Sequence, residues 1–241
     1  MKLKPKKERR GDNLTPSILH RDDLPLGGFA GLREHRLVMS PKLFGQHVNP
    51  GTFPGIGNFV YLADARFNPK GETRMHDHHE VDVVSVMIEG RIAHEGSLGH
   101  GQELVAYDVQ VQRAGAEGFS HNEVNPDDSK NRMIQIWVLP EKPGECAAYK
   151  LYKLENGAVA RVYGGSKKQT STFPSHTTVE VALLNGEQQV EFEDTSVVYI
   201  TQGQGVINDN VNATDGDLIT GNHFNFKAGS DVHLIVVQHK N

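Results

Sequence analysis

The sequence has a single cysteine, Cys146, among its 241 residues, and no apolar run that approaches the ~20 residues needed to span a bilayer. One cysteine excludes an intramolecular disulfide framework and a cysteine-rich zinc site. The N-terminal stretch MKLKPKKERRGDN is basic, but no apolar segment follows it, as a secretory signal would require. The formal net charge of −5 gives no reason to expect a nucleic-acid partner. These absences predict a soluble, cytoplasmic protein without a membrane partner.

Helical periodicity is also nearly absent after residue 55, where glycine, proline, asparagine and aspartate interrupt the chain every few residues. Short runs of β-branched and aromatic residues stand between these turn residues, as is typical of strands in an antiparallel sandwich or barrel. We therefore expect an all-β fold. The predicted strands are Phe59–Ala63, Val83–Ile88, Val109–Gln112, Met133–Leu139, Val179–Leu184, Val197–Thr201 and Leu234–Val237.

The chain is expected to divide near residue 145, because a strand stops at Pro140 and the following segment EKPGE (141–145) is typical of a linker. The two halves resemble each other weakly: VMIEGRIAHEG (86–96) and YITQGQGVIND (199–209) both have the pattern strand, glycine turn, strand. This pattern suggests duplication of one β-barrel unit. We expect an N-terminal barrel with a metal site over residues 1–145, which includes the basic arm, and a C-terminal barrel over residues 146–241.

Histidines gather where one predicted strand begins, in TRMHDHHEVDVV (73–84). Side chains at i and i+2 of an extended strand share a face, so His76 and His78 point the same way, whereas His79 points to the other side. The later stretch FSHNEV supplies His121 and Glu123 at the same spacing. If the two segments pair, three imidazoles and one carboxylate converge. This set suits Fe(II), Mn(II), Ni(II), Cu(II) or Zn(II) and leaves one or two coordination positions open.

Two further acidic residues leave the details of this set open. Glu80 and Asp82 have the same strand parity as His76 and His78, so either could accept a hydrogen bond from an imidazole and orient it. Asp82 could also replace Glu123 as the carboxylate ligand.

The remaining histidines are not expected to bind metal. His79, His94 and His100 are assigned to the surface. In the second half, counting back from the Gly203 turn places Gln189 where a His-x-His pair would recur. His233 lies near the expected counterpart of His121, but it is a lone histidine and is expected to be a hydrogen-bonded strand residue. We therefore expect one metal per chain and no catalysis in the second barrel.

The sequence around the histidines resembles the cupin superfamily and, more closely, the pirin family. The first cupin motif is matched by Gly71, His76, His78, Asp82 and Gly90, and the second by Gly115 and His121. The stretches that resemble pirins are VMIEGRIAHEGSLGHG (86–101), AGAEGFSHNEVNP (114–126) and MIQIWVLPE (133–141).

This resemblance is strong from about Gly71 to Glu145 and only architectural in the second half. It implies two cupin barrels (double-stranded β-helix, jelly-roll-like) in one chain. It also implies a metal, usually iron, in the N-terminal barrel, and this metal would be bound by His76, His78, His121 and Glu123. The family's His-Pro-His-Arg-Gly-Phe-Glu stretch is HDHHEVD here, and its Ala-Gly-x-Gly turn has one additional residue, so the rim of the pocket differs.

The resemblance implies a metal-dependent dioxygenase of the pirin or quercetinase type, an oxidoreductase similar to quercetin 2,3-dioxygenase. Its partners would be a flavonol-like phenolic substrate and O2, and its metal Fe(II), with Mn, Ni, Cu and Zn as alternatives. Glu123 would be both a ligand and the base that takes the substrate proton. The alternative is a non-enzymatic, metal-dependent regulator with a protein partner, such as a transcription cofactor. In both cases we expect a monomer.

Overall fold

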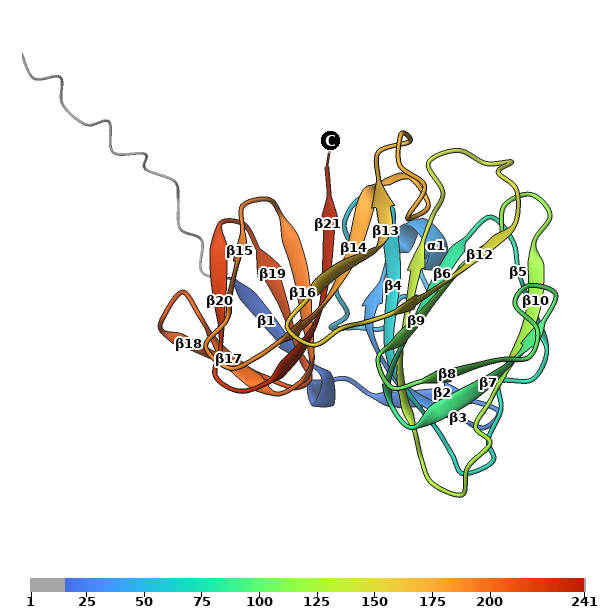
Figure 1. Cartoon of the computed structure of the whole chain (residues 1–241), viewed down its shortest axis with the longest axis horizontal. Helices are drawn as coiled ribbons and strands as arrows, with labels where there is room; N and C mark the ends of the chain where they lie inside the picture. Colours follow the sequence, from blue (N-terminus) through green and yellow to red (C-terminus); the bar gives the residue numbers. More distant parts are fainter. Residues whose placement is uncertain (1–15, 241) are drawn as a thin grey trace, which may run out of the picture.

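The computed structural model describes residues 16–240 and consists almost entirely of strands, arranged in two barrels that lie side by side (Figure 1). The basic arm expected in the N-terminal barrel lies in residues 1–15, outside the described residues. The first barrel has a seven-stranded sheet, in the order β12 (Ala148–Lys153), β9 (Asp108–Arg113), β6 (Asp82–Glu89), β11 (Arg132–Val138), β4 (Phe59–Phe67), β3 (Leu32–Met39) and β2 (Leu26–Phe29). Its four-stranded sheet has the order β5 (His76–His78), β10 (Phe119–Val124), β7 (Arg91–Gly96) and β8 (Gln102–Val105).

The second barrel repeats this plan and confirms the all-β prediction of two barrels. Its six-stranded sheet has the order β1 (Ser17–His20), β19 (Asp217–Gly221), β16 (Ser196–Gln202), β21 (Val232–His239), β14 (Ser175–Leu184) and β13 (Val159–Gly165). Its four-stranded sheet has the order β15 (Gln189–Phe192), β20 (Phe224–Ala228), β17 (Gln204–Ile207) and β18 (Val211–Thr214).

Two edge strands cross the expected boundary at residue 145. β1 comes early in the chain but pairs with β19 of the second barrel. β12 follows the linker but pairs with β9 of the first barrel. Figure 1 shows the blue β1 among the orange and red strands of the second barrel. Each barrel is therefore completed by a strand from the other half of the chain, and backbone hydrogen bonds tie the two halves together.

The two large sheets pack face to face and share a hydrophobic core, to which Val84 and Ile134 contribute from the first barrel and Val181 and Ile235 from the second. The opposite faces of these sheets line the barrel interiors, so their central strands are buried on both sides. Such strands require apolar residues at nearly every position. For this reason the continuous apolar runs in the sequence predicted these strands correctly. The seven predicted ranges lie within β4, β6, β9, β11, β14, β16 and β21, except that one range extends one residue past the end of β11.

The interior of the first barrel is apolar at one end and polar at the other. On the inward face of β6, Met87 joins an apolar cluster with Phe67 and Leu104. Ser85, two residues earlier on the same face, instead donates a hydrogen bond to Glu123 of the small sheet. The polar end is therefore built where the small sheet closes the barrel.

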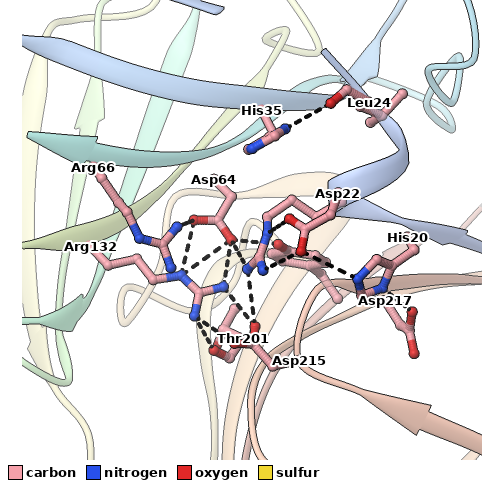
Figure 2. Close-up of polar contacts among 12 residues, drawn as sticks. His20, Asp22, Leu24, His35, Asp64, Arg66, Arg132, Thr201, Asp215 and Asp217 are labelled. Atoms are coloured by element: carbon pink, nitrogen blue, oxygen red, sulfur yellow. Dashed lines mark hydrogen bonds and ion pairs between the residues drawn. The ribbon is translucent and has the colours of Figure 1, made fainter. Parts of the chain in front are cut away.

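A buried ion cluster connects the two barrels (Figure 2). Asp64 of β4 accepts hydrogen bonds from Nε of Arg132 at 3.0 Å and from the hydroxyl of Tyr199 in β16 at 2.6 Å. Arg132 also donates to the carbonyl oxygen of Thr201 at 2.7 Å and to Asp215 at 2.7 Å, both in the second barrel. Asp64 and Arg132 are each 1% exposed, so these charges are paired inside the junction.

Helical structure is minor. The four-residue helix α1 (Pro41–Phe44) begins after Ser40, whose side chain accepts a hydrogen bond from the backbone N–H of Lys42, and η1 (Arg21–Asp23) is a single 3₁₀ turn. Within residues 16–240, no helix has the length and apolar character that crossing a membrane requires.

Candidate metal centre

The three predicted histidine ligands converge in the small sheet of the first barrel. β5 pairs antiparallel with β10, so that His76 lies directly opposite His121. Nε2 of His121 is 3.0 Å from Nε2 of His76 and 3.1 Å from Nε2 of His78. Two nitrogens bound to one cation at about 2.1 Å each lie about 3 Å apart when the bond angle is about 90°. The three nitrogens therefore have a spacing that fits one divalent cation.

The surroundings leave the lone pairs of these nitrogens free. Burial, with a smaller contribution from the neighbouring His76, lowers the pKa of His78 to about 4. Burial, with contributions from His78 and His76, lowers the pKa of His121 to about 2. His78 and His121 are therefore neutral at pH 7. Nδ1 of His76 lies 2.9 Å from the carbonyl oxygen of Arg74, which only accepts, so Nδ1 carries the proton and Nε2 is the nitrogen free to bind.

Glu123 follows His121 by two residues on β10 and is fully buried. Its carboxylate accepts hydrogen bonds from Oγ of Ser85 at 3.2 Å and from Nε2 of Gln110 at 3.1 Å, and Nε2 of Gln135 lies 3.4 Å away. Burial raises the pKa of Glu123 to about 7, although the hydrogen bonds from Ser85 and Gln110 lower it. At neutral pH this carboxyl group can therefore either hold or release a proton.

The predicted ligands do not all meet at one point. Donor atoms of His76, His78 and His121 lie within 4.8 Å of one another, and Glu123 belongs to an adjoining group with His121 and His94. The structure thus brings three imidazoles together and places the carboxylate beside one of them.

His94 is buried, and its assignment to the surface was wrong. The Gly90 turn returns the chain into the barrel, so alternate residues of β7, including His94, face the interior. His94 lies directly opposite Glu123 in the β7–β10 register and is 0% exposed. His79 and His100 are exposed, as expected.

Glu80 and Asp82 do not share the face of the histidines. Glu80 has a φ of +50°, which interrupts the extended chain between β5 and β6, so the strand parity is not carried across it. Its carboxylate accepts a hydrogen bond from the backbone N–H of Gly144 at 2.9 Å. Asp82 points into the junction between the barrels, where it accepts hydrogen bonds from the hydroxyl of Tyr163 at 2.7 Å and from Nε of Arg113 at 3.3 Å. The prediction from parity was therefore wrong for both carboxylates.

Aromatic side chains line the same end of the barrel, and the sequence analysis missed them. The ring of Trp137 packs on Tyr61 at a centroid distance of 4.4 Å and lies edge-on to His78 at 5.5 Å. Phe44 stacks on Trp137 at 6.3 Å with an interplanar angle of 16°. Phe29, which is 46% exposed, meets the ring of His76 edge-on at 6.4 Å. These four rings, called the aromatic wall below, lie beside the imidazoles of His78 and His76.

The sequence signal for this wall was the alternation in the run QIW (135–137). Gln135 and Trp137 are half-buried and face the barrel interior, whereas Ile136 between them is fully buried in the shared core. Trp137 is therefore partly accessible to solvent.

In the second barrel, phenylalanines stand at the positions of the candidate ligands. β20 pairs with β15 and β17 as β10 pairs with β5 and β7. When the Gly90 and Gly203 turns are aligned, Phe224 corresponds to His121, Phe226 to Glu123 and Phe192 to His76. All three rings are buried, and Phe192 and Phe224 are 4.8 Å apart. An apolar cluster therefore fills the space that corresponds to the metal centre.

Two positions that were estimated by counting residues need correction. The counterpart of His76 is Phe192 rather than Gln189, because the loops of the two barrels differ in length. His233 lies in β21, the counterpart of β11, and so does not correspond to His121. It is the hydrogen-bonded strand residue that was expected, with Thr201 as the partner of its Nδ1.

Comparison with known proteins identifies relatives of this chain. The family model named Pirin matches residues 32–138. A quercetin 2,3-dioxygenase of Escherichia coli (strain K12) is 26% identical over 140 residues, which cover 55% of this chain and 60% of that protein. A pirin-like protein of Caulobacter vibrioides is 28% identical over 153 residues, which cover 58% of this chain and 65% of that protein. Both alignments therefore span less than two thirds of the relative's length.

Solved structures extend the similarity of fold to both barrels. The bacterial pirin YhhW from E. coli, in complex with nickel(II), has a TM-score of 0.79 at 18% identity over 93% of this chain and 98% of that chain. A quercetin 2,3-dioxygenase from Acinetobacter baumannii has a TM-score of 0.69 at 18% identity over 93% of this chain and 85% of that chain. The Pirin model therefore matches residues that lie in the first barrel, and the solved structures share the fold of both barrels.

Proposed function

We propose that this chain is a metal-dependent dioxygenase of the quercetinase type, which acts on a flavonol-like phenol with O2. The observation that carries the proposal is the cluster of three imidazoles beside a buried carboxylate, next to the partly exposed aromatic wall. His76, His78 and His121 hold the metal, and Glu123 completes the protein ligands. The names of the E. coli and A. baumannii relatives support the activity.

Fe(II) is the metal we propose, and the complex of E. coli pirin YhhW with nickel(II) supports a divalent cation in this fold. When bound, a redox-active cation supplies Lewis-acid activation of a substrate hydroxyl and a route for electrons to O2. Neutral imidazoles and one carboxylate leave a divalent site with a net positive charge. That charge favours the anionic form of a phenolic substrate.

Glu123 is suited to take the proton from the substrate hydroxyl. A general base must lie within hydrogen-bond reach of the proton it takes, and Glu123 lies beside His121 in the adjoining group of donor atoms. Ser85 and Gln110 fix one carboxylate oxygen through their hydrogen bonds, both to Oε1. The other oxygen, Oε2, has only the long 3.4 Å contact with Gln135 among the described residues, so it is the oxygen available to the substrate.

The aromatic wall gives the proposed substrate a surface to bind. A flavonol is flat, and aromatic rings prefer offset stacking or edge-to-face contact at centroid distances of about 4.5–7 Å. Trp137 offers a ring face or edge near His78, and Phe29 contacts His76 from the exposed side. A substrate held between them has its hydroxyl groups near the imidazoles.

The test is oxygen uptake by protein loaded anaerobically with Fe(II) and then mixed with quercetin and O2. We expect O2 consumption together with loss of the flavonol's visible absorbance. Glu123→Gln keeps the size of the side chain and should retain much of the metal but lose turnover. Glu89→Gln, at an exposed carboxylate that ends β6, is the matched control and should behave as wild type. If iron-loaded wild type consumes no O2 with several flavonols and catechols, the enzyme proposal fails and the metal-dependent regulator becomes the better account.

A further inference from the structure

Two buried ring nitrogens near the proposed metal ligands have no hydrogen-bond partner among the described residues: Nδ1 of His94 and Nδ1 of His121. The two histidines lie on the neighbouring strands β7 and β10, and their ring centroids are 5.4 Å apart. Both residues are 0% exposed, so water does not reach these nitrogens from the surface. Buried polar atoms are rarely left unpaired, so this pair calls for an explanation.

The two nitrogens have complementary roles. Nε2 of His94 lies 2.8 Å from the carbonyl oxygen of Leu98, which only accepts, so Nε2 carries the proton and Nδ1 has a bare lone pair. The contact of the Gln112 amide with the same Nε2 is longer, at 3.4 Å, and does not change this assignment. In His121, Nε2 is the nitrogen that converges with the other two imidazoles. Its Nδ1 therefore carries the proton when Nε2 binds a cation.

We propose that His94 is a positioning residue, whose Nδ1 accepts a hydrogen bond from Nδ1–H of His121 when the metal is bound. A histidine that binds a metal almost always donates its other N–H to an acceptor, which fixes the ring and increases its basicity. His76 already has such an acceptor in the carbonyl oxygen of Arg74, at 2.9 Å. Among the described residues, His121 has none, and the lone pair of His94 is the complementary group on the adjacent strand.

The proposal rests on the metal site of the proposed function, although it does not depend on the reaction catalysed there. It also gives the carbonyl oxygen of Leu98 a role, because this oxygen holds His94 in the tautomer whose Nδ1 can accept a hydrogen bond. His94 and His121 belong to one group of donor atoms with Glu123, and their ring centroids are 5.4 Å apart, so the two rings are close enough for a contact between them.

The test uses Co(II) as the probe and proton NMR as the readout. In wild type we expect three hyperfine-shifted imidazole N–H resonances that exchange with solvent, one each from His76, His78 and His121. The resonance of His121 should exchange slowly, because its N–H is buried and hydrogen-bonded.

Two substitutions of His94 separate the lone pair from the bond to Leu98. His94→Gln keeps a donor for the carbonyl oxygen of Leu98 but has no acceptor near Nδ1. It should shift the His121 resonance, speed its exchange and weaken Co(II) binding by roughly 10–100-fold. His94→Asn places an acceptor near Nδ1 and should restore both the resonance and the affinity. His100→Ala, an exposed histidine beyond the same strand, should leave both unchanged.

Three outcomes would contradict either the positioning role of His94 or the metal site itself. If His94→Gln leaves the His121 resonance and the Co(II) affinity unchanged, the positioning role is refuted and the metal site stands. If wild type shows a fourth exchangeable resonance that His94→Gln removes, His94 is itself a ligand and the positioning role is again refuted. If wild type shows no shifted resonance at all, the metal site itself is refuted.

Discussion

Removal of the Asp64 carboxylate should destabilise the protein strongly, because it removes the buried charged partner of Arg132 and leaves only the partly exposed Asp215 to pair with it. Three arginines donate to this carboxylate: Arg132, Arg21 and Arg66. Their side chains are 1%, 12% and 36% exposed, respectively. Water therefore cannot take the place of the lost carboxylate at Arg132. Burial raises the pKa of Asp64, but the hydrogen bond and the charge of Arg132 lower it by more. The pKa of Asp64 is therefore lowered.

We expect Asp64→Ala to reduce the free energy of unfolding by about 3–5 kcal/mol, the usual cost of removing one partner from a buried ion pair. This is a large part of the ~5–15 kcal/mol typical of a folded protein. The measurement is urea unfolding followed by tryptophan fluorescence, since Trp137 lies in the first barrel. Asp22→Ala is the matched control, because Asp22 also pairs with Arg21 but its side chain is 60% exposed. An exposed ion pair contributes about 0–1 kcal/mol.

The double substitution Asp64→Ala with Arg132→Met makes the reasoning refutable. It removes the buried cation together with its partner, so it should cost less than Asp64→Ala alone. If the single substitution costs no more than the Asp22 control, or if the two changes simply add, the charge of Arg132 is not what Asp64 neutralises.

Three further predictions concern the candidate site and the second barrel. His121→Ala should abolish metal binding, because His121 is common to both candidate groups. His79→Ala should still bind one equivalent of metal per chain, measured by elemental analysis. Loss of metal from His79→Ala would require a different set of ligands. Asp82→Ala should lower the free energy of unfolding, because it leaves the buried Arg113 without this partner, yet leave metal content unchanged; metal loss at intact fold would make Asp82 a ligand after all. His233 is protonated more readily in the unfolded chain, since burial lowers its folded pKa from 6.5 to about 3. The stabilisation from neutral His233 is thus complete above pH 6.5 and is lost as the pH falls toward 3, by up to ~1.4 kcal/mol per pH unit. His233→Asn should flatten this part of the stability profile, and an unchanged slope would exclude His233 as its source.

Much of the candidate site could be predicted from local spacing. In a strand, residues two apart share a face, which is a property of the backbone alone. The pairs His76 with His78 and His121 with Glu123 could therefore be found in the sequence. Their meeting depends on the antiparallel register of β5 and β10, which sets His76 opposite His121. Spacing within one segment contains no information about that register.

The predictions that were wrong assumed that residue spacing or side-chain direction is preserved through a turn or loop. Asp82 was assigned the parity of His78, but the positive φ of Glu80 resets the strand between them. His94 was placed on the surface because it follows a glycine turn, but the turn leads back into the barrel. The phenylalanines of the second barrel were missed because counting residues ignores differences in loop length.

The sequence by itself determined the fold class and the central strands of the large sheets. Those strands are buried on both faces, and such burial requires continuous apolar runs. Such runs can be recognised in the sequence without knowing which strands pair with them. Only the tertiary structure decided which strands complete each barrel, as the exchange of β1 and β12 shows. It also decided the partners of each buried polar group: Asp64 with Arg132, Asp82 with Tyr163, and His94 beside His121. These pairs join residues far apart in the chain, and their contact depends on strand register and sheet packing rather than on any local pattern.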